Sequence, residues 1–263
     1  MTVRVGVFGA GGRMGSTVCR AVAADPELEL VGAIDPHHSG LDLRHVTGVD
    51  VPDLHIDPDP AALLEAGAEV VVDFTVLDAS RRNLAWAADN GVHAVVGTTG
   101  FSDEDCEQLR TRFTRSNCLI APNFAIGAVL MMRFAELAAP WFETAEIIEL
   151  HHDQKVDAPS GTAMLTVQRM AESSGDWAPD PTRKAVLEGA RGGDGPGGIR
   201  VHSVRLRGLV AHQEVLLGTT GQSLTIRHDS YDRDSFMPGV ILAVKQVAHH
   251  PGLTLGLDEY LGL

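Results

Sequence analysis

The stretch Val3-Arg4-Val5-Gly6-Val7-Phe8-Gly9-Ala10-Gly11-Gly12-Arg13-Met14-Gly15 decides the fold of the chain. Its apolar first half predicts a buried strand, which runs into a glycine-rich turn. A helix of period 3.6 follows and stops at Asp25-Pro26, and Leu28–Ile34 predicts the next strand, which ends at Asp35. A strand, a glycine turn, a helix, a second strand and an acid about 20 residues after the turn form the pattern of a dinucleotide-binding βαβ unit.

The glycine turn follows the spacing G-x-x-G-x-x-G on Gly9, Gly12 and Gly15, with Met14 in the place of the last glycine of the usual G-x-G-x-x-G. Glycines let the backbone approach a pyrophosphate, and the helix N-terminus attracts its charge. Asp35 is expected to accept hydrogen bonds from the adenosine ribose. A tight turn that binds nothing is the alternative interpretation.

The alternation of strands and helices continues to residue 125. Helices are predicted over Pro60–Ala66, Ala79–Asn90 and from Ser102, where Ser102 to Asp105 has capping character, and strands over Ala68–Phe74, Val92–Val96 and Cys118–Ala121. This pattern predicts an α/β fold with a Rossmann-type, doubly wound parallel sheet. Ligands of such sheets bind at the carboxyl ends of the strands. The residues expected there are Gly9 to Gly15, Asp35, Phe74-Thr75, Gly97 to Thr99 and Ala121 to Phe124.

From Ile126 the pattern changes. It predicts a helix over Ile126–Leu137, a strand over Glu143–Leu150, a helix from Gly161, a loop over 175–198, and strands over Val201–Leu206, His212–Leu217 and Ser223–Asp229. The order of these last strands suggests antiparallel pairing, and Asp232 or Asp234 is expected to cap a final helix. We therefore predict a dinucleotide-binding domain over 1–125, to which 240–263 returns, and a second α+β domain over 126–239 with a mainly open mixed or antiparallel sheet.

The stretch Glu149-Leu150-His151-His152-Asp153-Gln154-Lys155-Val156-Asp157-Ala158-Pro159-Ser160-Gly161-Thr162-Ala163 combines two imidazoles, an ammonium group and the start of a helix. Ser160 is a good N-cap, and the helix after it presents the N–H groups of Gly161 and Thr162 to whatever lies in front. Such a helix end prefers an anion. The stretch therefore predicts a site that holds a carboxylate and transfers a proton.

Other interpretations of this stretch carry less weight. His151 and His152 as a metal pair would point to opposite faces of a strand and lack an evident third ligand, so no metal is expected. They also fit ordinary histidines at a strand end. Ser160 lacks the G-x-S-x-G surroundings of a nucleophile, and Glu149 and Asp157 are expected to orient other groups.

The overall composition narrows the class of protein. Of 263 residues, 21 are Lys or Arg and 35 are Asp or Glu, a net charge of −14, which disfavours nucleic acid and anionic membranes as partners. No apolar run approaches the ~20 residues of a membrane span. The N-terminus enters a strand without a leader-like segment, and the three cysteines form no C-x-x-C pair. We expect a cytoplasmic protein.

The glycine turn, Val72-Asp73-Phe74-Thr75, Val96-Gly97-Thr98-Thr99-Gly100, Ala121-Pro122-Asn123-Phe124 and the block from Glu149 to Ala163 closely resemble the dihydrodipicolinate reductase family, also called the 4-hydroxy-tetrahydrodipicolinate reductases. The resemblance covers nearly the whole chain. It implies reduction of 4-hydroxy-tetrahydrodipicolinate to tetrahydrodipicolinate in the diaminopimelate and lysine pathway with NADH or NADPH. It also implies a cytoplasmic homotetramer and makes 126–239 the substrate-binding and oligomerisation domain.

The resemblance also assigns roles to residues. His151 corresponds to the proton donor and acceptor, Lys155 to a second proton donor, and His152, Gly161 and Thr162 to carboxylate-binding positions. Arg205 lies where the family has a basic residue on the sheet of the second domain, and whether it contacts substrate stays open. The positions that correspond to cofactor contacts are Gly9, Ala10, Gly11, Gly12, Arg13, Met14, Asp35, Gly97, Thr98, Thr99, Ala121, Pro122, Asn123 and Phe124.

The choice of cofactor stays open from the residues alone. Asp35 favours the ribose diol of NADH, while Arg13, His37 and His38 can offset its repulsion of a 2′-phosphate, so we predict use of both cofactors with NADH at least as good. Two other classes of protein compete with this interpretation. One is a different two-domain dehydrogenase, such as an amino-acid or semialdehyde dehydrogenase, and the other is a nicotinamide sensor without chemistry.

Overall fold

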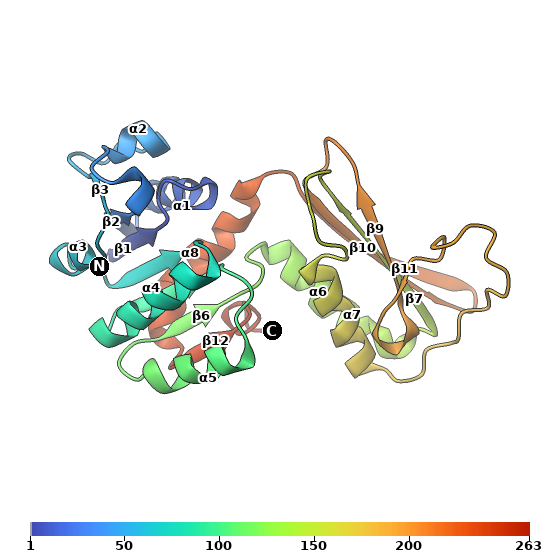
Figure 1. Ribbon diagram of the computed structural model, residues 1–263. Coiled ribbons are helices and arrows are strands. Elements are labelled where there is room, and N and C mark those ends of the chain that lie inside the picture. Colours follow the sequence, from blue (N-terminus) through green and yellow to red (C-terminus); the bar gives the residue numbers. More distant parts are fainter. Residues whose placement is uncertain (1) are drawn as a thin grey trace. The chain divides into compact units, whose positions relative to one another are not determined.

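The computed structural model describes residues 2–263. The chain divides into two compact units (Figure 1). Unit 1 is the chain up to Phe124 together with Phe236–Leu263, and unit 2 is Ala125–Ser235. The return to unit 1 thus begins at Phe236, a few residues before the predicted position 240.

Unit 1 contains a parallel sheet with the strand order β12-β6-β5-β4-β1-β2-β3. Because β1 lies inside this order, with β2 on one side and β4 on the other, the chain winds in both directions from it, which confirms the predicted doubly wound sheet. The short edge strands β3 and β12 were not predicted. The strands are β1 (Val3–Phe8), β2 (Leu28–Ile34), β3 (Ile56–Asp57), β4 (Val70–Asp73), β5 (His93–Val96), β6 (Cys118–Ile120) and β12 (Leu253–Leu255).

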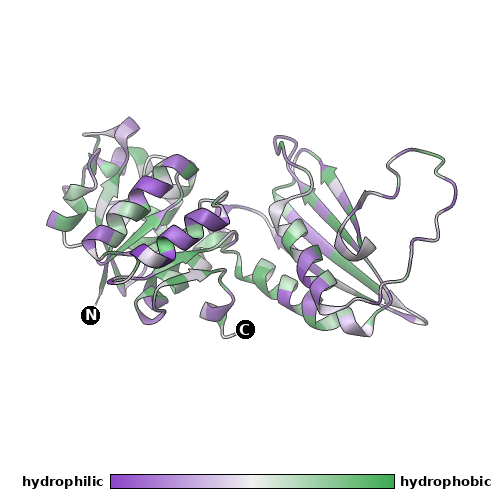
Figure 2. Cartoon of the chain, turned by 60° about the horizontal axis from the view of Figure 1, so that its bottom comes forward, coloured by the Kyte–Doolittle hydropathy of each residue, from purple (hydrophilic) through white to green (hydrophobic). Residues whose placement is uncertain are grey.

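The central strands of this sheet are buried along their length. Val5, Val71, Val72 and Val95 have almost no exposed surface, as expected for parallel strands covered on both faces. In Figure 2 these strands are largely green, whereas the helices beside them carry both colours. The helices of unit 1 are α1 (Arg13–Ala24), α2 (Leu43–Thr47), α3 (Ala61–Glu65), α4 (Leu77–Asn90), α5 (Asp103–Arg112) and α8 (Met237–Gln246).

Two predicted helix caps have different outcomes. Ser102 and Asp105 form a reciprocal capping box at the start of α5, as predicted. The predicted cap of α8 is wrong, because Asp232 accepts a hydrogen bond from the N–H of Asp234 at 2.9 Å and so precedes a 3₁₀ turn, Arg233–Phe236. Helix α8 starts after that turn with a proline in its first positions and without a side-chain cap.

Unit 2 is a mixed sheet in the order β11-β10-β7-β9-β8 with α6 and α7 packed together on one side of it (Figure 1). The antiparallel pairing of β10 with β11 is as predicted. Pairing of β9 with β10 is not found, because β7 lies between them, antiparallel to β10 and parallel to β9. The elements are α6 (Ile126–Ala138), β7 (Thr144–His151), α7 (Gly161–Ser173), β8 (Gly193–Asp194), β9 (Arg200–Arg205), β10 (Ala211–Thr219) and β11 (Gln222–Ser230).

The parallel pairing has a physical reason. Two parallel neighbours need a long connection between them, and α7 with the segment after it provides one between β7 and β9. That segment, predicted as a loop over 175–198, is irregular up to 192 and then contains β8 and a 3₁₀ turn over Pro196–Gly198. Within residues 2–263 we find no helix with both the length and the apolar character needed to cross a membrane.

Replacing Gly15 by Ala is expected to destabilise unit 1. A Cβ at Gly15 would lie 2.0 Å from the carbonyl oxygen of Gly9, so backbone must move. Overpacking costs about 1–3 kcal/mol, and at about 2–4 °C per kcal/mol the melting temperature should fall by roughly 2–12 °C. Gly175→Ala is the control, because its Cβ meets no atom within 4 Å. Equal melting temperatures of the two variants would show that the close approach of Gly15 to Gly9 does not limit stability.

Candidate functional site

The glycine-rich turn brings the start of α1 onto the end of β1. Gly9 has a left-handed backbone with φ +69°, and its carbonyl oxygen accepts from the N–H of Gly12 at 2.9 Å. Helix α1 then begins at Arg13 without a side-chain cap. Its first turn points N–H groups at the space in front, which suits a phosphate.

Asp35 closes the other side of this turn and is nearly buried. One of its carboxylate oxygens accepts from the N–H of His37 at 2.9 Å, and the other from the N–H of Gly11 at 3.0 Å. His38 places its Nδ1 3.1 Å from the second oxygen. The carboxylate is therefore held against the glycine turn, and two histidines accompany it.

The ends of β4, β5 and β6 are joined by polar and aromatic contacts. The hydroxyl of Thr98 donates to the carbonyl oxygen of Thr75 at 2.9 Å and to Asp73 at 3.3 Å. Gly97 lies against Phe74, since a Cβ there would come within 1.9 Å of that ring. Phe74 and Phe124 have ring centroids 5.6 Å apart. Ala121 is buried, while Thr99 and Pro122 are exposed.

A cleft of about 730 Å³ lies beside these strand ends. Of the predicted cofactor residues, Gly9, Gly12 and Asp35 line it, and the others do not. Thr75, which was expected at this edge of the sheet, lines it as well, and so do Arg82 and Asn83, which were not predicted. The place of Thr75 directly after a strand indicated its position at the sheet edge. Arg82 and Asn83 lie on α4, and the sequence does not show which side of that helix faces the cleft.

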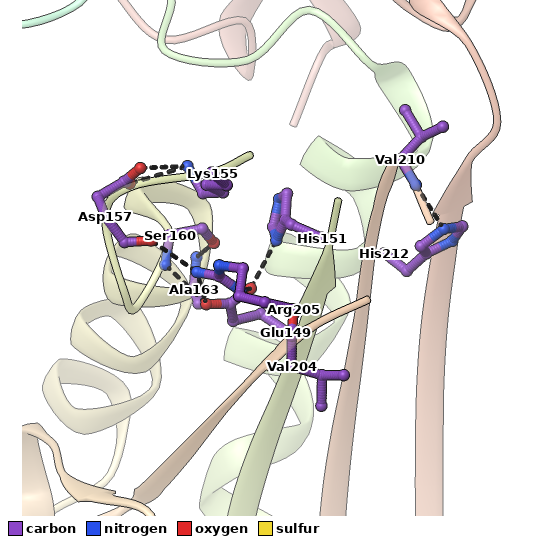
Figure 3. Close-up of polar contacts among 10 residues, drawn as sticks. All are labelled: Glu149, His151, Lys155, Asp157, Ser160, Ala163, Val204, Arg205, Val210 and His212. Carbon is purple, nitrogen blue, oxygen red and sulfur yellow. Dashed lines mark hydrogen bonds and ion pairs between the residues drawn. The ribbon is translucent and has the colours of Figure 1, made fainter. Parts of the chain in front are cut away.

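In unit 2, His151 stands at the end of β7 with its ring bonded to Glu149 (Figure 3). Residues two apart on a strand point to the same face, so these side chains meet. The distance from Nδ1 of His151 to Oε2 of Glu149 is 2.5 Å. A carboxylate at Nδ1 assigns the ring proton to that nitrogen and leaves Nε2 as the outward atom.

Glu149 has no exposed side-chain surface and binds further groups. Arg205, on β9, donates Nη1 to Oε2 and Nη2 to Oε1, both at 2.8 Å. The backbone N–H of Ser160 donates to Oε1 at 3.2 Å. Arg205 also donates to the carbonyl oxygen of Asp157 at 2.6 Å. Arg205 is thus a partner of Glu149, and its exposure is limited.

These contacts set the titration of the pair. Burial raises the pKa of the Glu149 carboxyl, but hydrogen bonds from Arg205, Ser203 and His151 outweigh it and hold that pKa below its usual value. Burial lowers the pKa of His151 below its usual value, and Glu149 opposes this effect. The charges of Lys155 and Arg205 lower the pKa of His151 further.

The loop between β7 and α7 carries the remaining predicted residues. Nζ of Lys155 donates to both carboxylate oxygens of Asp157, at 2.7 and 2.8 Å, which lowers the pKa of Asp157. His152 is exposed, and its Nδ1 accepts from the N–H of Gln154 at 3.2 Å. The hydroxyl of Ser160 accepts from the N–H of Ala163 at 3.2 Å, which confirms the predicted N-cap of α7.

At the start of α7, space is open in front of Gly161, where a Cβ would meet no atom within 4 Å. His151 and Ser160 bind the two oxygens of the same carboxylate, so the ring lies beside this helix end. In residues 2–263 no three His, Cys, Asp or Glu side chains are grouped so as to hold a metal ion. A dinucleotide-type sheet joined to a unit with such a helix end defines a two-unit, nicotinamide-dependent oxidoreductase.

Comparisons with known proteins identify the family. The family model described as dihydrodipicolinate reductase, N-terminus, matches residues 3–124, and the one described as dihydrodipicolinate reductase, C-terminus, matches residues 127–261. A protein of Nocardia farcinica named 4-hydroxy-tetrahydrodipicolinate reductase is 51% identical, with 100% of both chains covered. Its namesake in Corynebacterium urealyticum is 48% identical, with 99% of each chain covered. This chain belongs to the dihydrodipicolinate reductase family.

A solved structure supports this assignment. It is described as dipicolinate-bound dihydrodipicolinate reductase from Paenisporosarcina sp. TG-14 and has a TM-score of 0.87 at 41% identity, covering 98% of this chain and 99% of that chain. The predicted family and fold class are therefore confirmed. The roles of individual site residues stay predictions.

Replacing Ser160 by Ala is expected to lower the stability of α7. The substitution removes the hydroxyl that accepts from Ala163 and keeps the backbone N–H that binds Glu149. Loss of such a cap costs about 1 kcal/mol, to be measured as a fall in the free energy of unfolding. Ser173→Ala, at the other end of the helix, is the control, since its hydroxyl donates to the carbonyl of Met170. An equal effect of both substitutions would show that the cap is not special.

Proposed function

We propose that this chain reduces 4-hydroxy-tetrahydrodipicolinate to tetrahydrodipicolinate with NADH or NADPH, in the diaminopimelate and lysine pathway. Family membership and relatives that bear this activity as their name support the proposal. The main structural support is that His151 and the N–H of Ser160 bind the same carboxylate, that of Glu149. This places the His151 ring beside the N-terminus of α7. A proton donor next to an anion site suits a cyclic dicarboxylate.

The residues of unit 1 fit a dinucleotide. Two glycines of the turn leave no room for a side chain, since a Cβ at Gly11 would lie 2.1 Å from the ring of His38 and one at Gly15 would lie 2.0 Å from the carbonyl oxygen of Gly9. Glycines at such a turn let the backbone approach a pyrophosphate. The start of α1 would take the phosphate charge, and Asp35 would accept from the ribose. When bound, the nicotinamide supplies the hydride. Gly97 to Thr99 and Ala121 to Phe124 are proposed as further contacts at the strand ends.

The residues of unit 2 bind and protonate the substrate. Reduction of a ring carbon conjugated to an imine leaves an electron-rich neighbour that must gain a proton. Nε2 of protonated His151 faces away from Glu149 and would donate it, and Nζ of Lys155 would serve as a second donor. His152, Gly161 and Thr162, with the positive end of α7, would hold the carboxylates.

The oligomeric state and location stay proposals. Helices α6 and α7 lie on the same side of the unit 2 sheet (Figure 1). Ile148 and Leu216, which alternate with the buried Ile147 and Val215, are only half-buried. This face is suited to contact with another subunit, and we propose a homotetramer formed through the second-unit sheets, in the cytoplasm. Light scattering of the purified protein tests the assembly.

The reaction is tested by a coupled assay with pyruvate, aspartate semialdehyde and the preceding synthase. Wild-type protein is expected to oxidise NADH and NADPH. Lys155→Ala should lose at least roughly a hundredfold in kcat, the low end of what a general acid contributes. Lys184→Ala, an exposed lysine of the irregular segment, should keep wild-type kcat. No oxidation of either cofactor by the wild type would refute the function.

The cofactor preference depends on the charge of Asp35. We expect the wild type to use both cofactors with NADH at least as efficient as NADPH, and an NADPH efficiency more than about tenfold better would overturn this expectation. Asp35→Asn keeps the size of the side chain and removes about 1 kcal/mol of repulsion toward a 2′-phosphate, so the NADPH to NADH ratio of kcat/KM should rise roughly fivefold. Asp42→Asn, which alters the cap of α2, should leave the ratio unchanged. A fall of this ratio in Asp35→Asn would contradict the proposed position of the Asp35 carboxylate beside the adenosine ribose.

A further inference from the structure

The buried carboxylate of Glu149 joins every part of the unit 2 site. It binds the ring of His151 on its own strand, the guanidinium of Arg205 on β9, and the N–H of Ser160 at the start of α7. Through Arg205 it also reaches the carbonyl of Asp157, whose side chain holds Lys155 (Figure 3). A fully buried charge with this many partners fixes the positions of its neighbours.

We propose that Glu149 is the positioning residue of the proton transfer: it holds His151 in one tautomer and one orientation, with Nε2 directed to the substrate. The inference rests on the proposed function for its kinetic readout. Glu149 does not touch substrate, because its side chain has no exposed surface. Its effect therefore acts through the ring of His151.

The chemistry follows from the hydrogen-bonding capacity of a carboxylate. An ionised carboxylate only accepts, so the Nδ1 atom that faces it must carry a proton. Nε2 then releases and regains the second proton of the ring. Arg205 keeps Glu149 ionised, since its two donors offset the loss of water around the buried carboxylate.

A purely structural role is the competing explanation, in which Glu149 only neutralises Arg205. The two explanations differ in what happens to His151. Neutralisation predicts that removing both charges together restores activity and leaves the titration of His151 as in the wild type. Positioning predicts that the loss at His151 persists when Arg205 is removed as well.

The charged groups around His151 come from several elements. Glu149 on β7 raises its pKa, while Lys155 in the loop and Arg205 on β9 lower it. On β10 the residue paired with His151 is the uncharged Ala211, and the neighbouring His212 binds Asp229 with its Nδ1 at 2.7 Å. Removal of the Glu149 charge therefore leaves cations as the nearest charged groups, and protonation of the ring becomes harder.

The experiment compares Glu149→Gln with the matched control Glu146→Gln. Glu146 lies on the same strand and also binds an arginine and a histidine, Arg191 at 2.5 Å and His202 at 2.7 Å. A Gln amide at 149 can donate to Nδ1 and reverse the tautomer of His151. We expect Glu149→Gln to lose roughly a hundredfold in kcat, the scale of a misplaced catalytic group, with KM for NADH unchanged.

The pH profile and a direct titration of His151 provide the decisive readouts. The limb of kcat that falls as pH rises should move to lower pH by about one pH unit in Glu149→Gln, because the ring loses an opposite charge. NMR titration of His151 in the free protein should show the same displacement. Glu146→Gln should show neither change.

Two further variants keep the inference testable if Glu149→Gln does not fold. Glu149→Asp retains the charge beside Arg205 and withdraws it from the ring, so kcat should fall at least roughly tenfold. The double variant Glu149→Gln/Arg205→Met should stay impaired. Wild-type kcat and an unmoved His151 titration in Glu149→Asp, or full recovery in the double variant, would overturn the inference.

The inference and the function can fail separately. If the wild type oxidises neither NADH nor NADPH in the coupled assay, the proposed function is refuted, while the NMR titration still measures the control of His151 by Glu149. If the wild type turns over and the His151 titration is the same in Glu149→Gln as in the wild type, the function stands and the positioning role of Glu149 is refuted.

Discussion

The burial of one carboxylate, that of Glu149, is the constraint on which unit 2 depends. An ion removed from water costs several kcal/mol unless its partners compensate for the lost solvation. Here Arg205 supplies two donors, His151 one and the N–H of Ser160 another. Those partners lie on different elements, so the strand order, the loop and the start of α7 must all be in place before the charge is stabilised.

This constraint also explains the strand order of unit 2. Because β7 and β9 pair in parallel, Glu149 lies opposite Ser203 and His151 lies opposite Arg205. This register brings Arg205 within reach of the Glu149 carboxylate. If β9 paired with β10 in a hairpin, the guanidinium would lie away from the carboxylate. The parallel pair in this mixed sheet therefore has a structural role, because it brings Arg205 to Glu149.

The candidate cofactor site of unit 1 consists mainly of backbone groups. A dinucleotide has a long anionic centre, and in the proposed function the turn at Gly9 to Gly15 would meet it with N–H groups and the start of α1. Gly15 is required because a Cβ would collide with the carbonyl of Gly9, and Asp35 is held by the N–H groups of Gly11 and His37. All of these contacts lie within one βαβ unit, so they are encoded locally.

The difference between local and distant contacts explains what could be predicted from the sequence. The first strand, α1 and β2, the capping box at Ser102 and the cap at Ser160 depend on neighbouring residues, and all of them were predicted. The strands β3 and β12 are too short to show the alternation of apolar and polar residues that predicts a strand. They form by pairing with the edges of the sheet.

The site shows the same division. The histidines, the lysine and the cap lie within one stretch and could be proposed together. Arg205 is 56 positions from Glu149, and no pattern in the sequence joins them. The sequence analysis left open whether Arg205 contacts substrate, and its partnership with Glu149 was not predicted. The register of β7 and β9 decides the matter.

The pair formed by Lys155 and Asp157 differs from that of Arg205 and Glu149 in its exposure to water. Asp157 is more than half exposed, and an ion pair at such a position contributes only about 0–1 kcal/mol. A carboxylate with less access to water would attract the ammonium of Lys155 more strongly than Asp157 does. Asp157 thus keeps Lys155 paired and in place at little cost, and its release would expose a charge that water readily solvates. Glu149 cannot be released in this way, because it is buried and bound on both oxygens. The candidate site therefore combines a fixed, buried carboxylate beside His151 with an exposed carboxylate beside Lys155.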